Sequence, residues 1–124
     1  MQSNDMVVVV TPNYLPEQSE PNQHRYLFSY HVQVRNNSAQ AAQLISRHWV
    51  ITDAEQNVQE VKGLGVVGKQ PLIGPGEVFE YSSGCPLPTP FGTMKGSFHF
   101  VGENGVPFDV SIDEFVLSMP RTLH

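Results

Sequence analysis

The chain has 124 residues, a length typical of a single compact domain that builds its own core. Only 15% of the residues are charged and 40% are hydrophobic, which excludes a charge-rich disordered chain. The formal net charge is -5 and the seven Lys and Arg are spread singly, which argues against a nucleic-acid partner, because such proteins need a basic surface to neutralise phosphates.

The N-terminal stretch MQSNDMVVVVTPNY carries no positive charge of the kind that opens a signal peptide. Its apolar run from Met6 to Val10 is too short to span a membrane. Cys85 is the single cysteine, so the chain forms no internal disulfide, which is typical of a reducing compartment. We therefore expect a cytoplasmic protein without membrane insertion.

Alternation of apolar and polar residues, which is typical of half-buried strands, dominates the chain. The residues expected to face a core are Tyr26, Phe28, Tyr30, Val32 and Val34, then Ile45, Trp49 and Ile51, then Met94, Phe98 and Phe100, then Phe108, Val110, Ile112, Phe115, Leu117 and Met119. We expect Trp49 to pack between two sheets. The alternation slips by one residue at Asp113 and Glu114, which indicates a bulge.

Turn sequences rich in Gly, Asn, Asp and Pro separate these runs and leave no room for a long helix. The best helix candidate, Ala39 to Ile45, runs into a strand pattern. The pattern predicts an all-β protein, an antiparallel immunoglobulin-like sandwich of seven to eight strands in one domain over residues 1–124. Because no Cys…Trp…Cys pattern is present, the fibronectin type III-like subtype is favoured. Edge strands of such a sandwich can pair between copies, which leaves a homodimer open.

The stretch GLGVVGKQP contains two overlapping nucleotide motifs built on Gly63, Gly65, Gly68 and Lys69. Both motifs need a helix directly after the glycines, and the prolines at 71 and 75 prevent one. The segment is then a turn that uses glycine conformations, in which the loop amides and Lys69 offer at most a weak anion or nucleotide site.

The chain shows no catalytic or metal-binding pattern. The five histidines are isolated from one another in the sequence, although His31 and His99 could meet across a sheet. Acidic residues in TDAEQN could hold a hard cation, but acidic turns are common. Cys85 has no nearby base and is expected to be a small buried thiol. We expect no catalytic residue, no metal site and no cofactor.

The stretch CPLPTPFG has too many prolines for a central strand and is interpreted as a rigid loop. It presents Leu87, Pro88 and Phe91 as candidate contacts for an unknown protein partner. Burial of these side chains against the core is the alternative.

Several segments together resemble the bacterial ApaG family. They are the run from SRHWVITD to EYSSG, the pattern at Leu87, Thr89, Pro90, Gly92, Met94 and Gly96 to Phe98, the upstream YLFSYHVQVRN and the closing FDVSIDEFVLSMP. The resemblance implies a fibronectin type III-like sandwich and an association with cobalt resistance and magnesium efflux. A similar module in eukaryotic proteins looks like an interaction domain.

Two functions follow from the residues and the resemblance together. The first is a non-catalytic protein-interaction or regulatory module, whose part in cation efflux is indirect because the chain has no membrane span. The alternative is a divalent-cation or nucleotide and pyrophosphate sensor that uses the loop from Gly63 to Lys69. We do not expect an enzyme.

Overall fold

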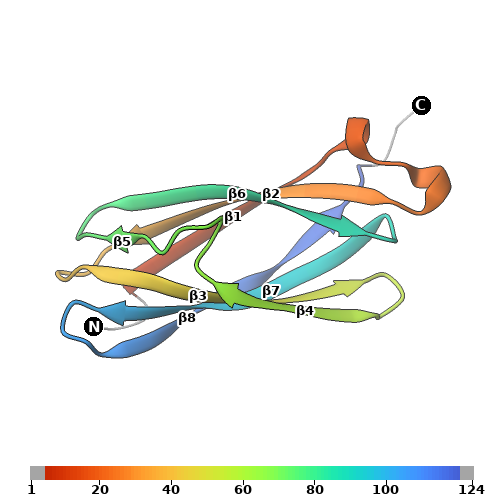
Figure 1. Cartoon of the computed structure of the whole chain (residues 1–124). Coiled ribbons are helices and arrows are strands. Elements are labelled where there is room, and N and C mark those ends of the chain that lie inside the picture. The colour runs from red at the N-terminus through yellow and green to blue at the C-terminus, as the bar shows by residue number, and fades with distance from the viewer. Residues whose placement is uncertain (1–4, 121–124) are drawn as a thin grey trace.

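The structure, a computed structural model, describes residues 5–120 (Figure 1). Its elements are β1 (Met6–Tyr14), the 3-10 turns η2 (Pro16–Gln18) and η3 (Pro21–Gln23), β2 (Tyr26–Asn36), β3 (Ala42–Asp53), β4 (Val58–Leu64), β5 (Leu72–Ile73), β6 (Val78–Leu87), β7 (Phe91–Gly102) and β8 (Pro107–Ser118). No helix within residues 5–120 has the length and apolar character needed to cross a membrane.

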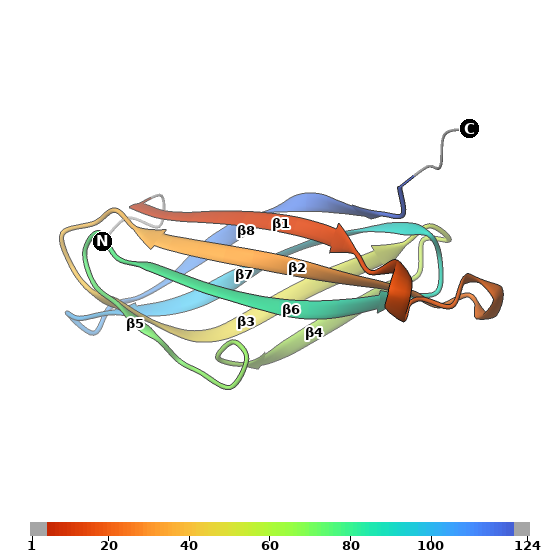
Figure 2. The same cartoon turned by 90° about the horizontal axis from the view of Figure 1, so that it is seen from above.

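The strands form two antiparallel sheets that lie one above the other (Figure 1). The smaller sheet has the order β1-β2-β6, and the larger one has the order β4-β3-β7-β8 with β5 paired to β3. Seen from above, β8 runs beside β1 on one side of the sandwich (Figure 2). On the opposite side, β6 and β4 are the outermost strands of their two sheets. The antiparallel β-sandwich predicted from the alternation is confirmed.

The core lies between the two sheets and centres on Trp49, which is 2% exposed. Tyr30 of the smaller sheet meets its ring from one side, and Phe98 and Phe115 of the larger sheet meet it edge-on. Such aromatic pairs add about 0.5–1.5 kcal/mol each beyond the burial of their area. The prediction that Trp49 packs between the sheets is confirmed.

A bulge in β3 changes which residues face the core. The pairing of β3 with β7 shifts register between Leu44 and Ser46. Leu44 is therefore buried before the bulge and Trp49 after it, although one residue number is even and the other odd. The prediction that Ile45 shares the buried face is wrong, because Ile45 lies within the bulge and is only half-buried. The helix candidate over 39–45 is also wrong, since β3 begins at Ala42.

The bulge predicted near Asp113 and Glu114 is confirmed. The pairing of β7 with β8 shifts register between Met94 and Gly96, opposite Ile112 and Phe115. The shift returns Phe115 and Leu117 to the core face, and Leu117 is fully buried. Met119, which the alternation placed with them, follows the end of β8 and is 37% exposed, so that part of the prediction is wrong. Strands β3 and β8, which flank β7, each contain a bulge. The two bulges bend the larger sheet without exposing its inner face.

Candidate functional site

The glycine segment, residues 63–69, ends β4 in a tight two-residue turn. The amide of Val66 donates to the carbonyl of Lys69 at 2.8 Å, and the amide of Lys69 donates back to Val66 at 2.9 Å. Between them, Val67 has φ 44° and Gly68 has φ 79°. Positive φ at both central residues defines a type I′ turn, which suits the twist of the flanking strands.

Each glycine of the segment meets a separate steric demand. The Arg47 guanidinium lies over Gly63, 2.9 Å from where a Cβ would stand. A Cβ on Gly65 would collide with the Lys69 carbonyl oxygen, and Gly65 has φ +65°. Gly68 has open space around it and needs glycine only for its φ of +79°. The spacing that resembles a nucleotide motif is therefore explained by the turn at Gly65 and Gly68 and by the packing of Arg47 over Gly63.

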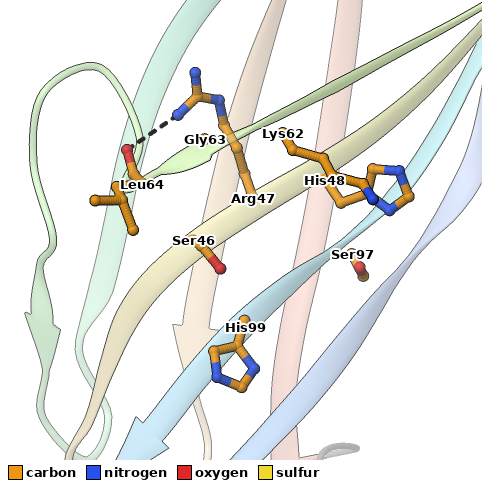
Figure 3. Close-up of a pocket in the computed structure, with 8 residues that line it drawn as sticks. All are labelled: Ser46, Arg47, His48, Lys62, Gly63, Leu64, Ser97 and His99. Atoms are coloured by element: carbon orange, nitrogen blue, oxygen red, sulfur yellow. Dashed lines mark hydrogen bonds between the residues drawn. The ribbon is translucent and has the colours of Figure 1, made fainter.

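Arg47 holds the glycine segment against β3. Its Nη1 donates to the carbonyl of Leu64 at 3.1 Å (Figure 3). The same nitrogen donates to the carbonyl of Gly65 at 2.9 Å. The amide of Gly65 donates to the carbonyl of Ile45 at 2.7 Å. The amides of Gly65, Val66 and Lys69 are thus all engaged inside the protein, which leaves few loop donors for an anion. The segment continues into β5 and not into a helix, as the prolines predicted.

An open pocket of about 390 Å³ lies beside this segment, on the outer face of the larger sheet. We call it the outer-face pocket, and its lining consists of Ser46, Arg47 and His48 from β3, Lys62, Gly63 and Leu64 from β4, and Ser97 and His99 from β7 (Figure 3). The strand register sets Lys62 opposite His48. It also sets His48 opposite Ser97 and Ser46 opposite His99. The side chains that line the pocket therefore come from three adjacent strands.

A carboxylate on a neighbouring strand holds each histidine ring of the pocket. His48 Nε2 lies 2.8 Å from Glu60 Oε1, and His99 Nδ1 lies 2.7 Å from Asp109 Oδ1. Neither carboxylate lines the pocket. A carboxylate partner fixes the orientation and tautomer of an imidazole, so the second nitrogen of each ring is left for another partner.

The proline segment differs from its prediction. Strand β6 extends to Leu87, which is 4% exposed, so the prediction that Leu87 forms an exposed apolar tip is wrong. Strand β6 tolerates Pro86 because it is an edge strand, paired only with β2. Pro88 is exposed, and Phe91 is 52% exposed at the start of β7.

Phe91 belongs to a larger apolar surface at one end of the outer face. We call this surface the end patch, and it consists of Val58, Phe91 and Val116, which are 62%, 52% and 58% exposed. Thr52 pairs with Val58 and with Thr93, and Thr93 pairs with Val116, so one row crosses four strands. This patch was not predicted from the sequence, although alternation places Val58 and Val116 on outward faces.

The remaining candidate groups have structural partners. Burial raises the pKa of the Cys85 thiol to about 11, so it is an unreactive thiol in the core, as predicted. Asp53 accepts the amides of Glu55 and Asn57 and so closes the TDAEQN turn. Burial alone would raise the pKa of Asp53, but these hydrogen bonds outweigh it and hold that pKa below its ordinary value.

The idea that His31 and His99 meet across a sheet is wrong, because they lie in different sheets. His31 instead contacts Glu80 and Ser82 of β6. Within residues 5–120, no cluster of three or more His, Cys, Asp or Glu side chains could hold a metal ion.

The two-layer sandwich defines a protein of the fibronectin type III-like class, and comparison with known proteins gives its family. A family profile described as the ApaG domain matches residues 16–102. The chain is 65% identical to Protein ApaG of Bordetella pertussis over 120 residues, which cover 97% of this chain and 92% of that one. It is 55% identical to Protein ApaG of Ralstonia nicotianae over 124 residues, all of both chains.

A crystal structure of a putative ApaA protein from Bordetella pertussis superposes on this fold with a TM-score of 0.92 at 64% identity. The match covers 95% of this chain and 96% of that one. The chain therefore belongs to the ApaG domain family.

Proposed function

We propose that the protein is a non-catalytic module that binds a protein partner through the end patch. The observation that carries this proposal is the exposure of Val58, Phe91 and Val116 at more than half of their surface on the outer face of one sheet. Phe91 and Val116 lie on the paired strands β7 and β8, and Val58 of β4 lies in the same row as Val116 through Thr52 and Thr93. Exposed apolar side chains gathered on one face are typical of interaction sites. Phe91 therefore stays a predicted contact for the partner. Pro88 also stays one, because it is exposed in the connection that leads to Phe91.

The test is a comparison of partner capture by variants that keep the core intact. We expect Phe91→Ser with Val116→Ser to lose a partner that the unmodified chain captures from a lysate of its own organism. Val78→Ser is the matched control, because Val78 is 40% exposed on the other sheet. All three proteins should melt at nearly the same temperature. Equal capture by the double variant and the control would contradict the proposal.

A part in cobalt resistance or magnesium efflux, in this proposal, is indirect and runs through the captured partner in the cytoplasm. A deletion strain complemented with the Phe91→Ser, Val116→Ser variant should then remain as sensitive to cobalt as the deletion strain. If the variant restored cobalt tolerance as well as the unmodified gene does, the end patch would have no part in cobalt resistance. A homodimer through an edge strand, β4 or β6, is a further prediction that sedimentation at several concentrations tests.

The second candidate is a divalent-cation or nucleotide sensor that uses the loop from Gly63 to Lys69. One observation favours it: Lys69 is exposed and has no ion pair with any carboxylate in the described part of the chain. Calorimetry with cobalt, magnesium and ATP tests the candidate, with Lys69→Met as the variant. Absence of heat for all three ligands, or ATP binding unchanged by Lys69→Met, would contradict it.

A further inference from the structure

The outer-face pocket gathers hydrogen-bond donors without an acidic lining, in a chain whose formal net charge is -5. Lys62 forms no ion pair with a carboxylate among residues 5–120. The hydroxyls of Ser46 and Ser97 lie in the same lining and take part in none of the side-chain hydrogen bonds of the described chain. One ammonium and two hydroxyls that lack partners suit a ligand with several acceptor oxygens.

The two histidines add donors on the same face. Since Glu60 holds Nε2 of His48 and Asp109 holds Nδ1 of His99, the opposite nitrogens have no partner in the described chain. A carboxylate is only an acceptor, so the ring nitrogen facing it carries the proton in the neutral ring. Protonation then places the second proton on the nitrogen that lacks a partner. Each protonated ring becomes a donor for an anion while it keeps its carboxylate.

We propose that the outer-face pocket binds a tetrahedral oxyanion, the phosphate group of free phosphate or of a small phosphorylated molecule. Lys62 supplies the permanent charge, His48 and His99 supply charge when protonated, and Ser46 and Ser97 donate neutral hydrogen bonds. The pocket volume of about 390 Å³ lies within the range of small-molecule sites, about 300–1,000 Å³, so a phosphorylated molecule fits as well as a bare ion.

This site is separate from both proposed functions. The end patch lies on the same sheet face, but it uses Val58, Phe91 and Val116 and none of the residues that would bind the oxyanion. The glycine segment borders the pocket through Gly63 and Leu64, and Lys69, the charged group of the sensor candidate, is not part of the lining. The Arg47 guanidinium is directed to the carbonyls of that segment and is not assigned to the oxyanion (Figure 3).

The proposal has a definite pH dependence. The charged groups around the two rings are Arg47 of β3, Glu60 and Lys62 of β4, Lys95 of β7, and Asp109, Asp113 and Glu114 of β8. Imidazole is the side-chain group that ordinarily changes its charge between about pH 6 and about pH 8. Oxyanion binding should therefore be tighter at the lower pH. Sulfate is the right probe for this comparison, because its own charge does not change over that interval.

The experiment follows the imidazole signals of the isotope-labelled chain by NMR during titration with sodium sulfate, sodium phosphate and a phosphorylated sugar. Sodium chloride at matched ionic strength is the blank. We expect the rings of His48 and His99 to shift with a common dissociation constant, at least about tenfold lower near pH 6 than near pH 8 for sulfate. His31 is an internal control, because it also pairs with a carboxylate but lies on the other sheet. Tighter binding of the sugar phosphate than of free phosphate assigns a phosphorylated molecule, and equal binding assigns the free ion.

Two surface variants keep the proposal falsifiable. Lys62→Met should weaken sulfate binding about tenfold or more, since it removes a charge-assisted hydrogen bond, whereas Lys69→Met should leave it unchanged. The proposal would be overturned if the imidazole signals of His48 and His99 did not shift at high sulfate and phosphate concentrations. It would also be overturned if the Lys62→Met variant bound sulfate as tightly as the unmodified chain. So would ring shifts produced by zinc or cobalt when the oxyanions produce none, because the pocket would then be a cation site.

Discussion

The glycine segment and the outer-face pocket are neighbours, yet their polar groups are arranged in opposite ways. In the glycine segment, the amides of Gly65, Val66 and Lys69 and two carbonyls are engaged by bonds within the protein. In the pocket, Lys62 has no ion pair and the hydroxyls of Ser46 and Ser97 take part in no side-chain hydrogen bond within residues 5–120. The segment carries a recognisable motif and the pocket carries none. The spacing of the glycines therefore reflects the conformations that the backbone adopts. A ligand is bound instead where hydrogen-bond donors are not already bonded within the protein.

The largest effect expected in the glycine segment is that of Gly65→Ala. A Cβ at this position meets the Lys69 carbonyl oxygen in a backbone region that L residues avoid. We expect a loss of about 2–4 kcal/mol in the free energy of unfolding, measured by denaturant titration. Gly68→Ala is the control and should lose only about 1–2 kcal/mol, since open space surrounds it. If the two variants are equally stable, the close approach at Gly65 has no structural importance.

Arg47→Met should have the next largest effect. The substitution removes two hydrogen bonds to the carbonyls of Leu64 and Gly65 while the aliphatic contacts are kept. We expect a loss of about 1–3 kcal/mol in the free energy of unfolding. Faster hydrogen exchange at the Gly65 amide should accompany it, because that amide bonds to Ile45 across the same junction. An unchanged stability and an unchanged exchange rate would mean that Arg47 does not hold the segment.

Val67→Asn should act in the opposite direction. Val67 is a β-branched residue at φ 44° and is 52% exposed, so its side chain contributes strain and little burial. Asn followed by Gly is the preferred pair for a type I′ turn. We expect a gain of about 0.5–1 kcal/mol in the free energy of unfolding. A loss would indicate that Val67 has contacts that outweigh its backbone strain.

The smallest stability effect is expected in the pocket. Lys62→Met should change the free energy of unfolding by no more than about 0.5 kcal/mol, because Lys62 is exposed and forms no ion pair in the described chain. A matched thermal melt of the unmodified chain and the variant measures it. A loss as large as that of Arg47→Met would remove the contrast between the two regions, since Lys62 would then be structural.

Much of the fold was predictable from local patterns. Alternation placed Phe28, Trp49 and Phe98 in the core, and the slip at Asp113 located a bulge. Glycine and proline positions excluded the helix that both nucleotide motifs require. Ile45 was misplaced because the bulge in β3 interrupts alternation without a Gly or Pro to mark it.

The candidate sites were less predictable, for a physical reason. The pocket exists because His48 lies opposite Lys62 on one side and Ser97 on the other, and those pairings join segments far apart in the chain. Periodicity shows which face a residue occupies, but it does not give the register between strands. Leu87 was misassigned because its proline neighbours suggested a loop, whereas an edge strand also accepts proline.

The central claim is that ligand-binding capacity lies on the outer sheet face and not in the glycine segment. A backbone amide shift map of the isotope-labelled chain, recorded with and without saturating phosphate, compares both regions in one spectrum. The account predicts shifts at Ser46, His48, Lys62, Ser97 and His99, with the amides of Gly65, Val66 and Lys69 unmoved. Shifts confined to residues 65–69, with the outer face unmoved, would contradict it.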